Sequence, residues 1–472
     1  MSILSPEASG LSDLVAFFFN RTFHMLRPTS KAGPGTMNLI ATKTIRQGHT
    51  RESSLALIRE KGGIIYDARR RIAWPGKAAV VISTVAISRG RTEVLPKIDQ
   101  KHVSRISSFL IDADADETPR PLTSNALKSF QGSIVLGMGF TFDDDCPEAT
   151  PIIRMHELLR SNPQERGMIK IYVGGEQVNN QAVFSPQRYV IDFGEMPESE
   201  AIKHDALWRI VKDKVYPERA KLDGNKYPRR VYEWWKHCHG APALYEAIEG
   251  NSRVLVANRG AAKFLTFSFL PSGCVYSDKL YVFSDPAYSH FASIQSRVHE
   301  VWARMFGTSM KDDLTYTGTS CYENYPFPKS SDGLEVAGEI YNNERAAVMV
   351  KLQLGLTKLS NRLNSPDDHS SEVIRLRELH AAMDKAVLDA YGWSDIIPSY
   401  EFSGDYENED GSAGSVRLNF TEELRDEILR RLLALHAERL KAEQAAMPAA
   451  GAAASKAKKL KKSKDSSGPE LF

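Results

Sequence analysis

The chain has 472 residues, with 61 Lys and Arg against 59 Asp and Glu and a formal net charge of +2 at pH 7. That length allows about two to four domains, and the 42% hydrophobic and 25% charged residues are ordinary for a soluble globular protein. No apolar run reaches the length of a membrane span, and the four scattered cysteines lack CxxC spacing, which favours a reduced, cytoplasmic protein. Any nucleic-acid partner must be argued from local patches of charge.

The N-terminal part alternates helix and strand. Ser12 is expected to cap an apolar helix over 13–26, and the run "MNLIATKTI" at 37–45 is expected to form a buried strand. A second helix should begin at Thr50 and end before the Gly-Gly pair that follows it. "IIYDARR" and "AAVVISTVAI" then predict two strands close enough to be antiparallel neighbours. This order is half of a doubly wound α/β domain, so the front half of its sheet is missing from the pattern.

The remaining sequence changes its composition and its expected secondary structure twice. The polar residues 101–129, with the run "DADADE", are expected to connect two domains. Short strands rich in Gly and aromatic residues from 130 to 328, interrupted by a basic helical stretch near 199–237, predict a mixed, mostly β domain with helical insertions. Helices are then expected at 332–362, 371–391 and 421–445, with the acidic loop "SGDYENEDGSAG" before the last of them. The Lys-rich, low-complexity end is predicted to be disordered.

Short motifs give little chemistry. "HCH" at 237–239 suggests a metal site, but neighbouring helical residues point about 100° apart and no second ligand cluster is in view. Surface histidines at a helix end are the better interpretation. "GMG" at 137–139 is too short for a dinucleotide loop and predicts strand or bulge glycines. No phosphate loop and no nucleophile-base arrangement stands out, so the residues alone predict neither a metal nor a cofactor site.

Two longer phrases are "LIATKTIRQGHTRE" and "IIYDARRRIAWPGKAAVVISTVAI". They resemble parts of the MmeI-like restriction-modification family of adenine-N6 DNA methyltransferases. The first resembles the strand and turn after the catalytic loop of that family, and the second resembles the next strand, the target-base loop and the closing hairpin. The resemblance continues through "FQGSIVLGMGFTF", "RVLVANRGAAKFLTFSFLPSG", "CYENYPFP" and "GLTKLSNRLNSPDD", and it reaches about residue 445.

The resemblance implies a fold class and a set of domains. The expected fold is α/β, a partial doubly wound sheet of an S-adenosylmethionine (SAM)-dependent methyltransferase, followed by a mixed α+β target-recognition domain and a C-terminal helical domain. The implied boundaries are 1–100 for the methyltransferase half, 101–129 for a linker, 130–328 for target recognition, 329–445 for the helical domain and 446–472 for a disordered tail. The implied substrate is double-stranded DNA and the implied methyl donor is SAM.

Two elements of the family pattern are missing. The family binds SAM with a glycine-rich turn and transfers the methyl group at an Asn-Pro-Pro-Phe/Tyr loop, both upstream of the first helix. The sequence has no Asn-Pro-Pro or Asp-Pro-Pro, and its one Asn-Pro pair is followed by Gln. Because adenine N6 is a poor nucleophile that depends on such positioning, we expect the chain to be inactive alone and to need a separately encoded N-terminal half.

Two alternatives stay open, a stand-alone DNA-binding module and a truncated remnant without catalysis. The apolar strand expected at 37–45 argues against the module. It would be an open sheet edge, and it lacks the charges or prolines that normally protect such an edge from pairing or aggregation until Lys43.

The resemblance also implies site residues. Trp74 occupies the place of the aromatic residue that stacks on the flipped adenine, although an ordinary tryptophan at the edge of the core is the alternative. No residue of the chain is expected to bind the cofactor. The candidates for base recognition are amide and basic side chains of the recognition domain: Asn179, Asn180, Arg188, Arg259 and Lys263. The basic stretch 203–236 is a candidate track for DNA phosphates.

Overall fold

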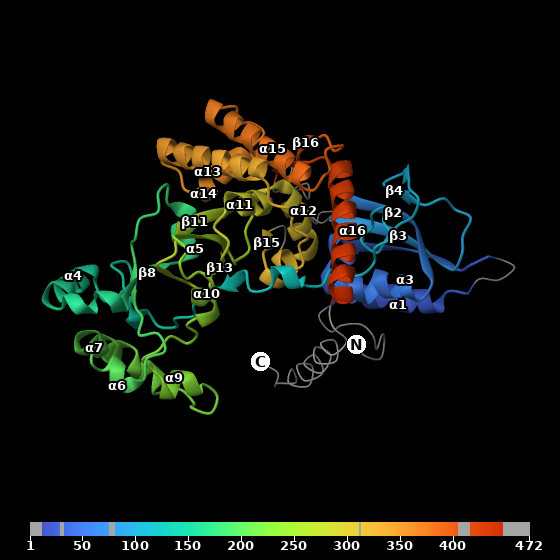
Figure 1. Ribbon diagram of the computed structural model, residues 1–472. Coiled ribbons are helices and arrows are strands. Elements are labelled where there is room, and N and C mark those ends of the chain that lie inside the picture. Colours follow the sequence, from blue (N-terminus) through green and yellow to red (C-terminus); the bar gives the residue numbers. More distant parts are fainter. Residues whose placement is uncertain (1–11, 29–32, 75–80, 311–312, 405–415, 447–472) are drawn as a thin grey trace.

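The computed structural model describes residues 12–28, 33–74, 81–310, 313–404 and 416–446 (Figure 1). The elements form an N-terminal sheet, a central region with two four-stranded sheets, and a set of long helices. One of these helices, α16 (Glu422–Ala446), lies between the N-terminal sheet and the central region in Figure 1. Among the described residues, no helix is long and apolar enough to cross a membrane.

The N-terminal sheet has the strand order β1-β3-β2-β4-β5. Both β1 and β2 are antiparallel to β3, which lies between them, so β1 and β2 run parallel to each other. Phe19, Phe23, Ile58 and Val85 are buried in the core between the sheet and its helices. The elements in chain order are α1 (Leu14–Met25), β1 (Thr36–Thr42), α2 (Gly48–Arg51), α3 (Leu57–Glu60), β2 (Gly63–Ala73), β3 (Val81–Arg89), β4 (Lys97–Ile98) and β5 (Lys101–His102).

The strand expected at 37–45 differs from the prediction in length and burial. It ends at Thr42, and residues 43–46 form a 3₁₀ turn. It is an edge strand of the described sheet, and Ile40 is 54% exposed. The expectation of a buried strand was therefore wrong, because β1 lies at the edge of the described sheet and part of it, including Ile40, is exposed.

Two helix starts also differ from the prediction. The cap of α1 is Asp13, whose side chain accepts a hydrogen bond from the Val15 N–H at 3.3 Å. Ser12 instead donates to the His49 carbonyl at 2.9 Å. The second helix begins at Gly48 rather than at Thr50. The hydroxyl groups of Ser12 and Thr50 were both plausible caps from the local sequence. In the structure they form hydrogen bonds between the two helices instead, and the Thr50 hydroxyl accepts from the Asp13 N–H.

The central region contains two sheets of short strands, one antiparallel throughout and one mixed. One has the order β11-β10-β13-β6 and the other β12-β8-β9-β7, in which β12 and β8 are parallel. Four of the helices, α4, α6, α7 and α9, lie together at one end of the molecule (Figure 1, left). The strands are β6 (Ser129–Gln131), β7 (Thr141–Phe142), β8 (Ile169–Val173), β9 (Tyr189–Ile191), β10 (Arg253–Asn258), β11 (Phe267–Pro271), β12 (Cys274–Tyr276) and β13 (Leu280–Phe283). The helices are α4 (Ile152–Ser161), α5 (Gly175–Asn180), α6 (Glu198–Ala201), α7 (Asp205–Lys214), α8 (Tyr216–Arg219), α9 (Pro228–Tyr232) and α10 (Pro242–Ala247).

The C-terminal part is mainly helical, as expected. The helix predicted over 332–362 is two helices, because Gln353 adopts a left-handed conformation with φ 50° and ends α13. The elements are α11 (Tyr288–Gln295), α12 (Arg297–Phe306), β14 (Thr308–Met310), β15 (Asp313–Thr315), α13 (Asp332–Leu352), α14 (Leu356–Leu363), α15 (Ser371–Ala390), β16 (Tyr400–Ser403), β17 (Arg417–Phe420) and α16. Most of the acidic loop and the Lys-rich tail lie outside the described residues.

The largest core cluster joins β10 and β13 to the long helices. Trp302 is fully buried there and its indole N–H donates to Asn324 at 2.9 Å. A buried ion pair between Arg297 and Asp384, at 2.7 Å, connects α12 to α15. The polar segment 101–129 also packs into the molecule, since Phe109 and Leu110 are buried. The observed fold is thus mixed α/β, with several small sheets and many helices.

Two histidines in this core make stability sensitive to acid. Burial, with the charge of His290, lowers the pKa of His299 to about 3, and burial lowers the pKa of His290 to about 4. Below the unfolded value of about 6.5, the unfolded chain binds a proton that folded His299 does not. The free energy of unfolding should therefore fall as pH decreases, by about 1.4 kcal/mol per pH unit from this residue.

We expect His299→Gln to remove this contribution. Denaturant unfolding at several pH values between 7 and 4 should show a shallower decline for the variant than for the wild type. His369→Gln is the control, because His369 is exposed. Parallel pH profiles for His299→Gln and the wild type would contradict the assignment.

Candidate nucleic-acid interface

A polar cleft lies where the end of β10, the short helix α5 and the start of α14 meet. Its volume is about 270 Å³. Three amide side chains line it, together with one lysine and several hydroxyl groups. The polar lining residues are Asn179, Asn258, Lys263, Thr266, Tyr316, Thr357, Ser360 and Asn361.

Strand β10 positions the first amide. Its residues 254–257 are almost entirely buried, as the continuous apolar run "VLVA" requires, and Asn258 follows at the end of the strand. The loop after it is well held. The Lys263 carbonyl accepts from the side chains of Arg304 and Arg417, each at 3.0 Å. The main chain of Ala262 pairs with Leu314 of β15 through two hydrogen bonds of 2.9 and 3.0 Å.

Helix α5 is wedged between β10 and α14. At its start, a methyl group at Gly175 would lie 3.1 Å from the side-chain oxygen of Asn258. At its end, the main chain of Asn179 and Asn180 packs directly on Gly355, just before α14. A methyl group at Gly355 would lie within 2.6 Å of the Asn179 carbonyl oxygen, so only glycine fits at this position. The amides of α5 and the polar face of α14 are held side by side in this way.

The cleft has hydrogen-bonding capacity but little charge. Among the described residues, the side chains of Asn179, Thr357 and Asn361 form no hydrogen bond. The side-chain oxygen of Asn258 accepts from the Gly260 N–H at 3.1 Å, which leaves its NH₂ group available. Burial raises the pKa of Tyr316 well above its usual value, so its hydroxyl stays protonated. This set suits a ligand with donors and acceptors and offers no acid-base pair.

The structure brings two of the predicted residues into this cleft. Asn179 and Lys263 both line it. Asn180 is exposed at the end of α5, next to Gly355. Arg259 directly follows Asn258, and its main-chain N–H donates to the Lys279 carbonyl at 2.8 Å. These four predicted residues therefore lie in the cleft or next in sequence to residues that line it.

Arg188 and Trp74 lie elsewhere. Arg188 precedes β9 in the second sheet, where it forms an ion pair with the buried Asp143 and lies 6.0 Å from the centre of the Tyr172 ring. Its role in DNA recognition stays a prediction. Trp74 directly follows β2 and is 43% exposed, which leaves its ring accessible. Its base-stacking role also stays a prediction.

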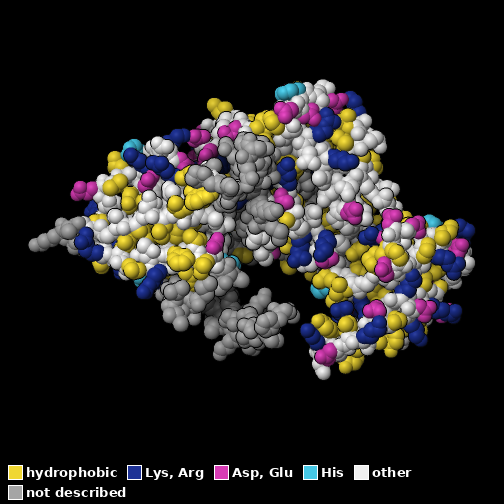
Figure 2. All heavy atoms as spheres, turned by 180° about the vertical axis from the view of Figure 1, so that it is seen from behind, with side chains coloured by type: hydrophobic (Ala, Val, Ile, Leu, Met, Phe, Trp, Pro, Cys, Tyr) yellow, Lys and Arg dark blue, Asp and Glu magenta, His cyan; other side chains and the backbone are white. Residues whose placement is uncertain are grey.

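Five of the ten Lys and Arg side chains in the basic stretch 203–236 form ion pairs with neighbouring carboxylates. Figure 2 shows Lys and Arg side chains mixed with Asp and Glu over the surface. Because such pairs reduce the attraction for phosphate, this stretch offers a weaker phosphate track than its sequence indicated. The pairs are Lys203 with Glu200, Arg209 with Asp205, Lys221 with Glu218, Arg229 with Glu195, and Lys236 with Glu233.

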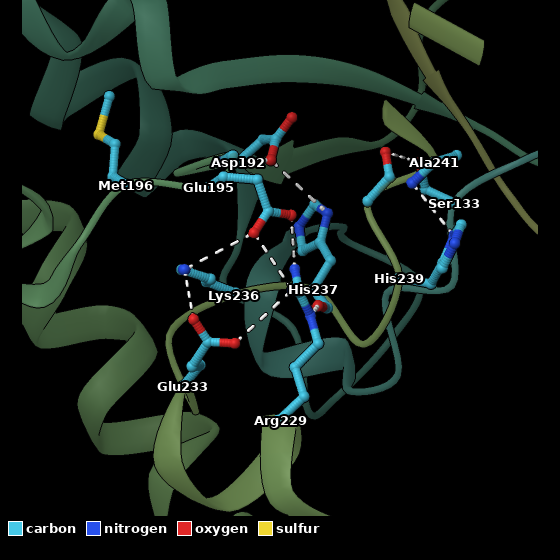
Figure 3. A network of polar contacts seen from close by, with 12 residues as sticks. Ser133, Asp192, Glu195, Met196, Arg229, Glu233, Lys236, His237, His239 and Ala241 are labelled. Atoms are coloured by element: carbon cyan, nitrogen blue, oxygen red, sulfur yellow. Dashed lines mark hydrogen bonds and ion pairs between the residues drawn. The ribbon is translucent and has the colours of Figure 1, made fainter. Parts of the chain in front are cut away.

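The "HCH" motif takes part in a structural network (Figure 3). His237 is buried, and its Nε2–H donates to the Ile191 carbonyl at 2.9 Å. Nδ1 of His239 accepts from the Ala241 N–H at 3.1 Å. Both rings thus have hydrogen bonds within the protein. In the part of the chain that the structure describes, no group of three or more His, Cys, Asp or Glu could hold a metal ion.

The comparisons with known proteins agree with the sequence resemblance. The family model "MmeI, target recognition domain" matches residues 152–329, which include α5, β10 and Lys263. The MmeI-like resemblance is confirmed. In a solved structure of the type IIL restriction-modification enzyme MmeI in complex with DNA, the same fold covers 93% of this chain, with a TM-score of 0.61 and 16% sequence identity.

The chain spans about half of that MmeI structure, since the match covers 54% of its length. A structure of the type IIG restriction endonuclease BpuSI matches 84% of this chain and 52% of its own, but with a TM-score of 0.30 and 10% identity it carries no argument. No curated protein matches the chain.

Sequence reasoning missed six of the eight polar residues that line the cleft, among them Asn258, Thr357 and Asn361. Asn258 directly precedes the predicted Arg259, and its place at the end of a buried strand was an available signal. Thr357 and Asn361 lie outside the matched domain, on a helix whose pattern "LTKLSNRL" indicates only an amphipathic helix. Their position depends on the approach of α14 to α5, which no local pattern reveals.

The contact at Gly355 generates a stability prediction. Gly355→Ala should lower the free energy of unfolding by about 1–3 kcal/mol, because the added methyl group overlaps the main chain of α5. Gly333→Ala is a matched control in α13, since no atom lies within 4 Å of the place that its methyl group would take. Alanine should stabilise that helix by up to about 1 kcal/mol. Denaturant unfolding of both variants checks this, and an unchanged midpoint for Gly355→Ala would refute the close packing.

Proposed function

We propose that this chain is the DNA-recognising portion of a site-specific adenine-N6 DNA methyltransferase of a type IIL restriction-modification system. The observation that carries the proposal is the match of residues 152–329 to the MmeI target recognition domain. The fold shared with DNA-bound MmeI over most of the chain supports it. The substrate under this proposal is double-stranded DNA.

The amide cleft is the proposed recognition site. Asn and Gln form bidentate hydrogen bonds with adenine, and Arg and Lys pair with guanine or with phosphate. Asn179, Asn180 and Asn258 offer the first kind of contact, and Arg259 and Lys263 offer the second. The rigid support of this region by β10, α5 and the Ala262–Leu314 pair favours precise positioning of such contacts.

The N-terminal sheet is proposed to be the second half of a SAM-dependent methyltransferase sheet. Its antiparallel strand β3 between the parallel strands β1 and β2 is what a closing hairpin in a doubly wound sheet requires. No described strand pairs with the outer edge of β1, which leaves that edge available to further strands. A separately encoded N-terminal half is one proposed source of such strands.

The residues of this chain do not form a SAM site of the family type. The glycine-rich turn of the family precedes the first helix, and the sequence has no Asn-Pro-Pro-Phe/Tyr loop. SAM would supply the methyl group in the intact enzyme. Trp74, exposed at the end of β2, is proposed to stack on the flipped adenine there.

A stand-alone DNA-binding module without catalysis is the second candidate. The amide cleft would serve it equally well. The open edge of β1, with Ile40 exposed, is the observation against it, because independent modules normally protect such edges.

Weak, salt-dependent DNA binding is the first expected result. The affinity of the full chain for duplex DNA should fall as salt rises, and Lys263→Ala should lower low-salt affinity and reduce the slope of log K against log salt by about 1. Lys385→Ala is the control, because Lys385 is on α15 and forms an ion pair with Asp389. Fluorescence anisotropy at several salt concentrations measures both. Absence of binding at low salt would refute the proposed function.

Absence of methyl transfer by the chain alone is the second expected result. Purified chain, mixed-sequence duplex DNA and SAM with a labelled methyl group should give no incorporation into DNA. Label in N6-methyladenine would contradict the inactivity but would support the methyltransferase proposal. Label in another base would contradict the proposed adenine specificity.

A further inference from the structure

The amide cleft combines two parts of the chain with different assignments. Asn179 and Asn258 belong to the residues that match the target recognition domain, 152–329. Thr357 and Asn361 belong to α14, in the helical region after that domain, and nothing in the family match assigns them a role. All four residues line the same cleft.

Helix α14 presents a polar face to the cleft. Leu356 and Leu359 are buried, with 2% and 0% of their surface exposed. Thr357 and Asn361 are both exposed and are four residues apart, so they lie on the same face of the helix. The sequence of α14 therefore separates an apolar face, which packs on the core, from a polar face that lines the cleft.

The position of α14 is fixed at both ends. At its start, Gly355 packs directly on the main chain of Asn179 and Asn180. At its end, Arg377 of α15 donates to the Leu363 carbonyl at 2.9 Å, and Arg362 forms an ion pair of 2.6 Å with Asp368. Side chains on a helix held in this way have a defined direction, as selective recognition requires.

The chemistry of the cleft fits the edge of a nucleobase better than a phosphate. Lys263 is the one charged side chain among the described lining residues. The amides of Asn179, Asn258 and Asn361 each carry donors and an acceptor in one plane, and those of Asn179 and Asn361 form no hydrogen bond within the described structure. A neutral, flat ligand edge with a donor beside an acceptor matches this set.

We propose that α14 is a second base-reading element, in which Asn361 hydrogen-bonds the edge of an adenine and Thr357 contacts the methyl group of a thymine. An asparagine amide pairs bidentately with adenine N6 and N7, and a threonine methyl group packs on the thymine methyl group. This inference rests on the proposed DNA-recognition function and extends base recognition beyond residues 152–329.

Selection from a pool of randomised duplex DNA tests the inference. The full chain is used as wild type, Asn361→Ala, Asn361→Asp and the control Asn343→Ala, an exposed asparagine of α13 outside the cleft. The wild type should enrich adenine at one position. Asn361→Ala should reduce that preference by about 10- to 100-fold, while low-salt affinity for unselected DNA is retained.

The Asp variant separates base contact from a structural role. A carboxylate accepts a hydrogen bond but donates none, so Asn361→Asp should change the preferred base at that position from adenine to cytosine. A disturbed fold would not produce such a change. Asn343→Ala should retain the wild-type preferences.

The outcomes distinguish the inference from the function on which it rests. DNA binding by the wild type with preferences that neither Asn361 variant changes would overturn the role of α14 and leave the recognition function intact. Wild-type binding with no preference at any position would overturn base reading in this cleft. No binding of the pool by the wild type at low salt would overturn the proposed function itself, and the inference with it.

Discussion

One nearly buried guanidinium, that of Arg70, attaches the N-terminal sheet to the rest of the molecule. It lies 2.7 Å from Asp99, near the end of the sheet, and 2.8 Å from Asp426 of α16, with Glu422 at 3.4 Å. Burial alone would lower the pKa of Arg70, but the three carboxylates outweigh burial and raise it. Loss of this cation would leave several acidic groups facing each other in a partly dry junction, which is far more costly than loss of a surface ion pair.

Helix α16 connects the N-terminal sheet to the recognition region, because it contacts Arg70 and also packs in the largest core cluster. Its apolar side chains belong to the largest core cluster, and the His436 ring lies 5.9 Å from that of Trp302 on α12. The same junction also buries a guanidinium, that of Arg46, beside other positive charges. Burial, together with the charges of Arg70 and Arg71, lowers the pKa of Arg46 to about 9. A cavity of about 120 Å³ borders these groups, so the sheet and the helices do not pack closely at this point.

The parts of this architecture that follow local patterns were predictable, and those that depend on distant contacts were not. The apolar run of β10 and the helical periodicity of α13, α15 and α16 indicate those elements directly. The break between α13 and α14 did not show, because Gln353 adopts a left-handed conformation that glycine or asparagine would have signalled. Asn179 and Lys263 could be chosen from the sequence as amide and basic residues of the expected recognition domain. Asn361 lines the same cleft only because Gly355 lets α14 approach α5 closely. The two helices are far apart in the sequence, so no local pattern indicates this contact.

The small net charge of the chain makes the cleft, with its single lysine, important for selectivity. A chain with a net charge of +2 gains little from long-range attraction to DNA, and many of the basic side chains in the stretch 203–236 already contact carboxylates. Sequence-independent affinity is therefore expected to be modest. Under the proposed function, selectivity then depends on hydrogen bonds from fixed amides, which discriminate between bases through the penalty for an unpaired donor or acceptor. In a rigid cleft with few charges, phosphate contacts add little to the binding free energy. The cost of an unpaired donor or acceptor then has its largest effect on the choice of base.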